Sequence, residues 1–344
     1  MGFLYFLESI RNPVLDFLMS AITFVGGEAV FLAIAIVLIW CVNKRNGYFT
    51  LLTCFFGIVI NQTLKLIFRI PRPWIKDPDF TIVESAREEA TGYSFPSGHT
   101  QNVTGTFASL AAAKPKRAWV ITCSVIIALV AFSRMYLGVH TPLDVGVSLV
   151  IGVALALLLR PLFVSEERMK RVMPYVMLGA FLITVGFVLF TFLLPDEGLD
   201  PHNLESGRKN ACTMIGCVLG LILVYIVDNR YIRYPTHARW YAQIMKVGIG
   251  FAIVLLIKST LQTPLEWIFG GSMYIARAVR YFLLVAFAGC IWTLTFRFWS
   301  NLRIGCLDRF GERVMAWFTK VFTKKSVPSC EGESGASTQT VEHQ

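Results

Sequence analysis

A histidine and a carboxylate four residues apart, His140 and Asp144, lie between two apolar segments of this chain. Between them, Thr141 and Pro142 are typical of the N-cap and the first position of a helix. His140 is then expected at the start of that helix, where Asp144 can hold one ring nitrogen and leave the other free to attack. The pair Thr141 and Asp144 also has the spacing of a capping box, so these residues alone leave a structural alternative open.

Three cations are expected near this pair. Lys65 and Arg72 flank the end of one apolar segment, and Arg134 lies at the end of another. Cations at the hydrocarbon boundary are costly unless an anion or a carboxylate lies nearby. The planar fork of arginine suits phosphate oxygens, and lysine adds a compact charge. Each cation taken singly also fits an ordinary anchor at the end of a span, and Arg69 is a secondary candidate.

The tetrapeptide Pro96-Ser97-Gly98-His99 begins a further apolar segment. A helix start offers free backbone N–H groups and the positive end of its dipole to an anion. Gly98 permits close approach of the backbone, and the Ser97 hydroxyl is a further donor. Ser97 as a plain N-cap and His99 as a helix-terminal histidine are the structural alternatives. The joint occurrence of two histidines, three cations and this helix start favours a phosphate-transfer site.

The composition is that of a membrane protein. Of the 344 residues, 55% are hydrophobic and 16% are charged, and the net charge is +10. A soluble domain carries roughly 25% charged residues, so we predict an all-α polytopic membrane protein. The positive charge follows the loops and forms no basic soluble face, so no nucleic-acid partner is predicted.

The hydropathy pattern divides the chain into five parts. We expect an amphipathic, interfacial helix over 1–25, a motif-bearing core over 26–162, additional spans over 163–300, a basic amphipathic segment over 301–325 and a disordered tail over 326–344. The expected spans of the core are about 26–42, 48–68, 99–113, 118–135 and 142–160. Four more are expected at about 173–194, 211–228, 244–261 and 278–299.

Basic residues occupy alternate loops, which predicts the topology. The positive-inside rule places those loops in the cytoplasm. The opposite set, 69–98, 136–141, 195–210 and 262–277, then faces outward and contains all the unusual residues. We therefore expect the site on the extracytoplasmic face, in a bacterial cytoplasmic membrane.

Three segments together carry a family resemblance: Lys65-(six)-Arg72-Pro73, Pro96-Ser97-Gly98-His99 and Ser133-Arg134-(five)-His140-(three)-Asp144. They resemble the three signature motifs of the type 2 phosphatidic acid phosphatase superfamily, complete and in order. The resemblance covers about residues 26–160. It implies a six-helix membrane core and a metal-independent phosphohydrolase without a cofactor.

The resemblance also implies roles for the motif residues. His140 would attack phosphorus and form a phosphohistidine, and Asp144 would orient it. His99 would protonate the leaving oxygen and then activate water. The implied phosphate ligands are Lys65, Arg72, Ser97, Gly98 and Arg134.

The expected substrate is a lipid phosphate or a polyprenyl pyrophosphate, whose head would enter the polar site while its tail stays in the bilayer. The motifs bind phosphoryl groups and do not select among tails, and no oligomeric state is predicted. Two alternatives remain: a lipid phosphotransferase using the same phosphohistidine, and a transporter on the same scaffold. In the additional spans, Gly216-x-x-x-Gly220 has the spacing of a helix-packing face, and Arg277 and Arg280 are interpreted as span-end anchors.

Overall fold

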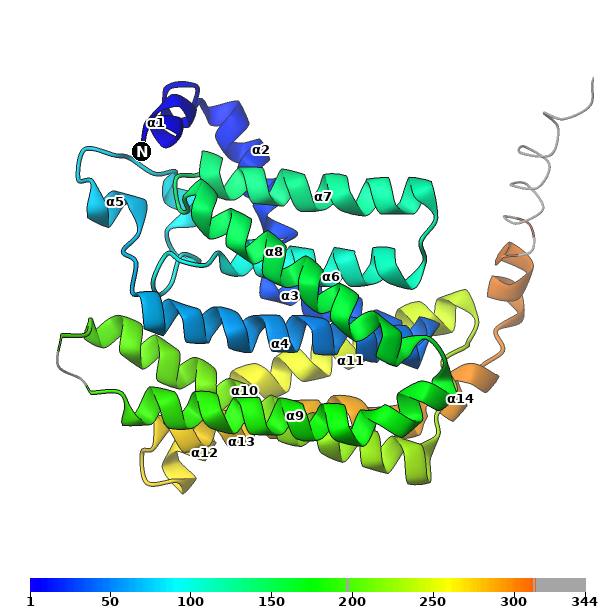
Figure 1. Cartoon of the computed structure of the whole chain (residues 1–344). Coiled ribbons are helices and arrows are strands. Elements are labelled where there is room, and N and C mark those ends of the chain that lie inside the picture. The colour runs from blue at the N-terminus through cyan, green and yellow to red at the C-terminus, as the bar shows by residue number, and fades with distance from the viewer. Residues whose placement is uncertain (196–197, 312, 314–344) are drawn as a thin grey trace, which may run out of the picture. The chain divides into compact units, whose positions relative to one another are not determined.

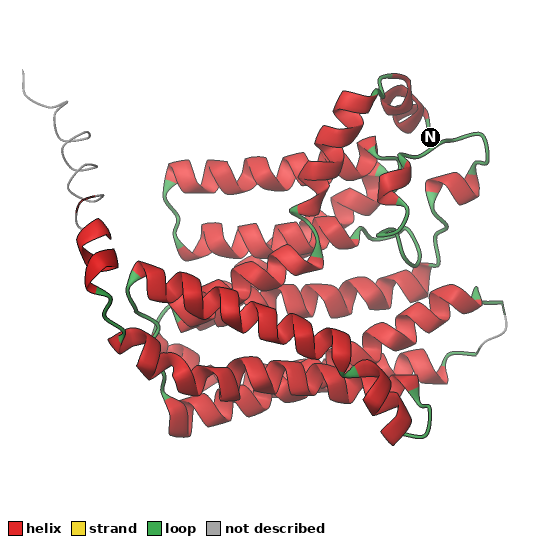
Figure 2. Ribbon diagram, turned by 180° about the vertical axis from the view of Figure 1, so that it is seen from behind, coloured by secondary structure: helices red, strands yellow, loops and turns green. Residues whose placement is uncertain are grey.

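The computed structural model describes residues 1–195, 198–311 and 313, and the described part consists of helices joined by loops (Figure 2). Seven helices are long and apolar enough to cross a membrane. An eighth span results if the bent pair Pro13–Phe24 and Glu28–Val42 counts as one. The prediction of an all-α polytopic membrane protein is confirmed.

The first half of the chain holds all three motifs (Figure 1). Its α-helices are α1 (Gly2–Ser9), α2 (Pro13–Phe24), α3 (Glu28–Val37), α4 (Lys44–Phe68), α5 (Pro73–Lys76), α6 (Gly98–Ala113), α7 (Arg117–Tyr136) and α8 (Pro142–Leu159). Three shorter turns complete this half: Leu38–Val42, Glu84–Ala86 and Arg160–Phe163.

The second half begins with two long antiparallel helices. Its α-helices are α9 (Glu166–Leu193), α10 (Pro201–Val227), α11 (Trp240–Thr260), α12 (Gln262–Ile268), α13 (Met273–Ala286) and α14 (Phe296–Asn301). Short turns at Asp228–Ile232, Phe287–Ile291 and Trp292–Thr295 extend α10 and join α13 to α14.

The N-terminus forms two helices where the sequence predicts one. The first helix ends at Ser9, and Asn12 caps the second, since its Oδ1 accepts from Leu15 N at 3.0 Å and Pro13 occupies the first helical position. The helix α2 then exposes apolar side chains, with Phe17 76% exposed. The pair α2 and α3 bends by 43° at Gly26-Gly27. A Cβ on Gly26 would lie 3.0 Å from the His99 carbonyl oxygen, so this bend needs a glycine.

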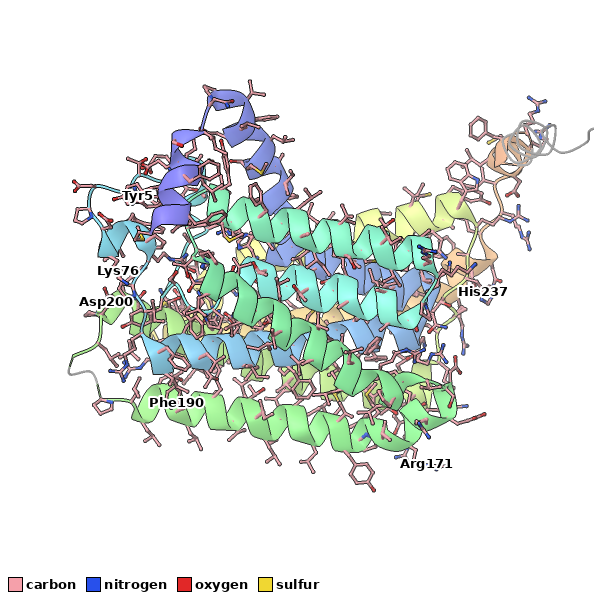
Figure 3. All side chains as sticks on the ribbon, turned by 45° about the horizontal axis from the view of Figure 1, so that its top comes forward. Tyr5, Lys76, Arg171, Phe190, Asp200 and His237 are labelled. Carbon is pink, nitrogen blue, oxygen red and sulfur yellow. The ribbon has the colours of Figure 1, made fainter. Side chains whose placement is uncertain are left out.

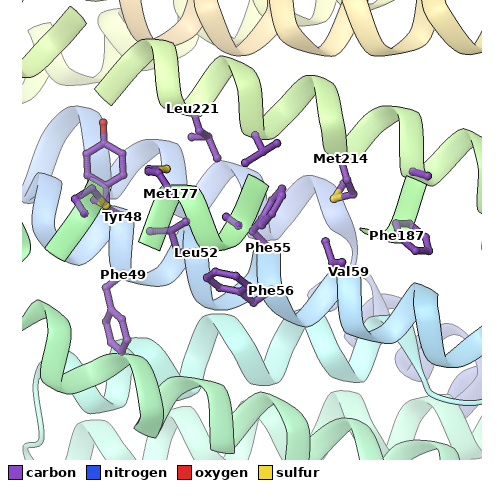
Figure 4. Close-up of a cluster of buried hydrophobic side chains, with 14 of the residues drawn as sticks. Tyr48, Phe49, Leu52, Phe55, Phe56, Val59, Met177, Phe187, Met214 and Leu221 are labelled. Atoms are coloured by element: carbon purple, nitrogen blue, oxygen red, sulfur yellow. The ribbon is translucent and has the colours of Figure 1, made fainter. Parts of the chain in front are cut away.

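The helix α4 is the centre of the largest apolar cluster and joins the two halves. Leu52, Phe55 and Val59 on α4 pack with Met177 on α9 and Met214 on α10 (Figure 4). Burial of this many large side chains is the main favourable term in such packing, because close contact maximises dispersion. The additional spans are therefore packed directly against a motif-bearing helix.

The helices α10 and α13 make the closest approach in the second half. A Cβ on Gly216 would lie 2.1 Å from the Ala278 carbonyl oxygen, and one on Gly220 would lie 2.7 Å from Val285 Cβ. Small residues let two backbones come together in this way. The prediction that Gly216 and Gly220 form a helix-packing face is confirmed.

The loops sort to two ends of the bundle. Tyr5, Lys76 and Asp200 lie at one end, and Arg171 and His237 lie at the other (Figure 3). Residues from Asn301 onward form a separate unit, of which 305–311 are helical. The predicted basic segment falls mostly, and the predicted disordered tail wholly, outside the described residues.

Candidate active site

His140 and Asp144 meet at the start of α8, and both are almost fully buried. His140 Nδ1 lies 3.5 Å from Asp144 Oδ2. The capping box is present as well, because the same Oδ2 accepts from Thr141 N at 2.8 Å and Thr141 Oγ1 accepts from Asp144 N at 3.3 Å. The two readings of this segment are therefore compatible, since one carboxylate both caps the helix and faces the imidazole.

Asp144 is held in place by the segment before α6. Ser94 is fully buried, and its Oγ donates to Asp144 Oδ2 at 2.6 Å. Ser97 N donates to the Asp144 carbonyl oxygen at 3.1 Å. These two bonds tie the second motif to the third, far apart in sequence.

The turn that carries His140 depends on a glycine. Gly138 has a φ of +80°, which side-chain-bearing residues rarely adopt. A Cβ there would also lie 2.7 Å from Arg11 Nη2 and 3.0 Å from Phe80 Cε1. The chain leaves α7 and reaches the N-cap of α8 within this short turn, which fixes the direction of the imidazole.

Lys65 and Arg72 donate to the loop before the second motif. Lys65 Nζ lies 2.9 Å from the Tyr93 carbonyl oxygen, and Arg72 Nη2 lies 2.7 Å from that of Thr91. Arg72 Nη1 donates to the Val139 carbonyl oxygen at 3.1 Å and lies 3.5 Å from His140 Nε2. Arg72 therefore stands beside the ring nitrogen that faces away from Asp144.

Arg134 is the most completely buried of the three cations, with 0% of its surface exposed. Its Nη1 donates to Thr23 Oγ1 at 2.8 Å, while Nε and Nη2 have no hydrogen-bond partner in the described part of the chain. A buried guanidinium without a paired carboxylate is unfavourable unless an anion binds to it. This cation is consequently suited to hold phosphoryl oxygens.

His99 lies in the first turn of α6, and its Nε2 is 2.9 Å from Glu89 Oε2. The hydrogen bond from His99 lowers the pKa of the Glu89 carboxyl, so this group stays ionised further into the acid range. Burial lowers the pKa of His99 and the charge of Arg134 acts in the same direction, while the hydrogen bond to Glu89 favours the protonated ring. An imidazole next to a carboxylate is suited to exchange a proton.

Ser97 and Gly98 form the start of α6. Ser97 is its N-cap, and the Ser97 Oγ accepts from Thr100 Oγ1 at 3.0 Å. The space beside Gly98 is open, since a Cβ there would meet no atom within 4 Å. Backbone N–H groups at such a start are free to donate to an anion.

Burial holds the pKa of His140 well below its usual value, and the charges of Arg72 and Arg134 act in the same direction. Asp144 opposes this shift, because a carboxylate favours the protonated ring. The ring is then neutral at pH 7. With Nδ1 directed at the carboxylate, the lone pair is assigned to Nε2, the nitrogen beside Arg72. A neutral imidazole of this kind is a nucleophile.

We name the eight predicted residues the motif cup: Lys65, Arg72, Ser97, Gly98, His99, Arg134, His140 and Asp144. They come from the end of α4, the approach to α5, the start of α6, the end of α7 and the start of α8. Arg69 lies outside it, because it is exposed at the end of α4 and its Nε donates to Leu66 of its own helix.

Three contributors were missed from the sequence: Thr23, Glu89 and Ser94. Ser94 lies two residues before Pro96, and Glu89 lies in a mixed charge run, so nearness to the motif was the only signal for either. Nothing in the sequence pointed to Thr23, which reaches Arg134 from α2.

Comparison with known families gives two separate matches. The model described as "PAP2 superfamily" matches residues 46–168, and the one described as "PAP2 superfamily phosphatase, transmembrane extension" matches residues 212–301. The second match covers most of the additional spans. The motif cup from Lys65 to Asp144 falls wholly inside the first.

Several curated proteins are similar to this chain. Undecaprenyl-diphosphatase BcrC of Bacillus subtilis is 30% identical over 156 residues, which cover 44% of this chain and 76% of that protein. An undecaprenyl-diphosphatase of Sulfolobus acidocaldarius is 29% identical over 140 residues, 40% of this chain and 66% of that protein. Phosphatidylglycerophosphatase B of Bacillus subtilis is 28% identical over 176 residues, 47% of this chain and 80% of that protein. No solved structure gives a significant match.

Proposed function

The chain belongs to the PAP2 superfamily, and from this premise we propose that it cleaves the phosphate or diphosphate ester of a membrane lipid through a phosphohistidine at His140. It is a membrane-embedded lipid phosphate hydrolase. The phosphohistidine, the roles of the individual residues and the side of the membrane are the proposal. The observation that carries it is the pair of buried arginines at this site: Arg72 Nη1 lies 3.5 Å from His140 Nε2, and two nitrogens of Arg134 have no hydrogen-bond partner in the described part of the chain.

In the first step, the lone pair on His140 Nε2 attacks phosphorus and forms the P–N bond. The bond between phosphorus and the leaving oxygen breaks, and His99 donates a proton to that oxygen. Asp144 stabilises the ring as it becomes positive, since its Oδ2 faces Nδ1. The cations Arg72 and Arg134 hold the phosphoryl oxygens as charge redistributes over them.

In the second step, a water molecule attacks phosphorus from the side that the lipid has left. His99, now neutral, accepts the proton of that water, and Glu89 stabilises the resulting imidazolium. The P–N bond breaks, inorganic phosphate leaves, and His140 returns to its neutral form. The residues thus end in their starting protonation states, with Ser97 and Gly98 contributing donors throughout.

The substrate proposed is a lipid monophosphate or a polyprenyl pyrophosphate. Relatives named as undecaprenyl-diphosphatases and as a phosphatidylglycerophosphatase support this range. We place the reaction on the outer face of a bacterial cytoplasmic membrane, because the basic loops are expected in the cytoplasm and the motif cup lies at the opposite ends of the spans.

Phosphate release from a panel of lipid phosphates and pyrophosphates, by the purified full chain in detergent, tests the proposal. Release should continue in EDTA and should disappear in His140→Ala and fall strongly in His99→Ala. Loss of activity in EDTA contradicts the metal-independent mechanism, and full activity in either variant contradicts the residue assignment.

Two rival functions give different results in the same assay. A phosphotransferase should label an added lipid acceptor while it releases little free phosphate. A transporter should release no phosphate in this assay, and its transport activity should survive in His140→Ala, since transport does not need the nucleophile. Neither rival has a specific observation in its favour in the described structure.

A further inference from the structure

A second polar hollow lies beside the motif cup, where the two halves of the chain meet. It contains about 510 Å³ of space, counting its open mouth. Helices α3, α4, α6, α10 and α13 all contribute to its wall. The polar side chains that matter here are Asn61 on α4, Gln101 on α6, Arg277 on α13 and Glu28 on α3.

Two amides in this hollow lack partners. Asn61 and Gln101 are each only 1% exposed, and neither the nitrogen nor the oxygen of either amide has a hydrogen-bond partner in the described part of the chain. Buried polar groups of this kind normally find a partner, because leaving one unpaired is costly. A Cβ on Gly57 would lie 2.6 Å from Gln101 Nε2, so the chain keeps a glycine where this amide needs room.

The second half supplies a cation to the same wall. Arg277 Nε donates to Thr213 Oγ1 at 2.8 Å, and its guanidinium carbon lies 5.7 Å from the centre of the Tyr281 ring. Glu28 also lines the hollow, so one positive and one negative group are present. The interpretation of Arg277 as a plain span-end anchor therefore omits its place in this wall.

The lining selects among the parts of a lipid phosphate. A hydrocarbon tail would leave the amides unpaired, which excludes it on energetic grounds. A second phosphate only accepts hydrogen bonds, so it would leave the amide oxygens and Glu28 without a donor even where Arg277 attracts it. A hydroxyl group both donates and accepts hydrogen bonds, and an amino group donates to Glu28 and to the amide oxygens. Both groups therefore match the polar side chains of this wall.

The hollow adjoins the motif cup through the backbone. Gly98, the first residue of α6, lines the hollow and belongs to the cup. Asn61 lies one helical turn before Lys65 on α4, and Gln101 lies one turn after Gly98 on α6. The wall residues on α4 and α6 therefore lie about one helical turn, roughly 5 Å along the axis, from the cup residues on the same helices.

We propose that this hollow binds hydroxyl or amino groups that a lipid phosphate carries close to its phosphate ester, and that the C-terminal spans thereby select the substrate. The proposal rests on the proposed function. It assigns Asn61, Gln101 and Arg277 to substrate specificity, with Arg277 as the contribution of the second half.

The test compares two substrates of equal chain length. One is a lysophosphatidic acid, which has a free hydroxyl near its phosphate ester, and the other is an alkyl phosphate without one. The readout is the ratio of kcat/KM for the two in wild type, Asn61→Leu, Gln101→Leu and Arg277→Leu. We expect the wild type to prefer the hydroxyl-bearing lipid, and each substitution to reduce the ratio about tenfold, since each removes a hydrogen-bond partner of the substrate.

Gln243→Leu is the matched control. It removes a half-buried amide at the start of α11, whose Nε2 donates to the Thr236 carbonyl oxygen and which does not line the hollow, and it should leave the ratio at its wild-type value. An unchanged ratio in all three test variants, or an equal loss on both substrates, overturns the inference while the proposed function stands. The proposed function itself is overturned if the wild type releases no phosphate from these two substrates or from any other lipid phosphate.

Discussion

The two ends of α4 each carry a partly or fully buried lysine in opposite circumstances. Lys44 Nζ lies 2.7 Å from Asp228 Oδ2 and 3.4 Å from the centre of the Tyr234 ring. Lys65 Nζ, near the other end, donates only to the carbonyl oxygens of Thr91 and Tyr93, and within the described residues it has no ion pair.

The difference separates a structural cation from a binding cation. Lys44 is neutralised by a carboxylate and ties α4 to the end of α10. Lys65 shares its surroundings with Arg72 and Arg134, and Asp144 is the carboxylate that acts on it. The excess positive charge at that end has no counterpart in the fold, so it is best explained by an anionic substrate.

The largest expected effect is on the nucleophile. His140→Ala should reduce phosphate release by about 10⁴-fold or more, because no other group can form the covalent intermediate. Lys44→Met is the matched control at the other end of α4 and should retain activity at temperatures below its Tm. Retention of a sizeable fraction of activity in His140→Ala would remove the distinction between the two ends.

Arg134→Met separates function from stability. Activity should fall by about 10² to 10³-fold, as for the loss of a donor to transition-state charge. The Tm in detergent should stay the same or rise, because a buried, largely unpaired charge is replaced by an apolar side chain of similar length. A lower Tm together with the lost activity would show that Arg134 supports the fold, and the comparison would fail.

Asp228→Asn should show the opposite pattern. It leaves the Lys44 ammonium without its carboxylate, and the free energy of unfolding should decrease by about 1–3 kcal/mol, discounted for the partial exposure of Lys44. Phosphate release well below the Tm should stay near the wild-type rate. The double variant Lys44→Met/Asp228→Leu should recover stability, as measured by denaturation in the same detergent. Failure to recover would mean that the pair is not the source of the effect.

The smallest effect concerns the acid–base pair. Glu89→Gln should reduce kcat/KM about tenfold at neutral pH, because His99 loses the anion that stabilises its protonated form. In the wild type the lowered pKa of Glu89 keeps this carboxylate ionised. Its stabilisation of protonated His99 is therefore fully present above the usual carboxyl pKa and is lost as the pH falls through the lowered pKa. The alkaline limb of the pH profile should move to lower pH in the variant, because His99 loses its proton more readily without the anion. An unchanged profile would exclude Glu89 from the reaction.

Local patterns in the sequence predicted much of the fold. The Thr141-Pro142 helix start and the α10 packing face at Gly216 and Gly220 follow from local spacing, and the places of the long helices follow from apolar runs, although α9 and α10 begin before the runs do. The break at Asn12 was missed because apolar residues on both sides of it read as one amphipathic helix. Asn12-Pro13 is the same helix-start pattern as Thr141-Pro142, and the structure shows that it does begin a second helix.

The sequence by itself determined which residues can do chemistry, because the types and spacings of the motif residues are local properties. Only the tertiary structure decided that Ser94 holds Asp144, that Glu89 faces His99 and that Arg277 shares a wall with Gln101. Those partners come from a loop and from helices distant in the sequence, so no sequence periodicity predicts that they meet. Their positions are set by which buried donors and acceptors remain to be satisfied once the helices have packed.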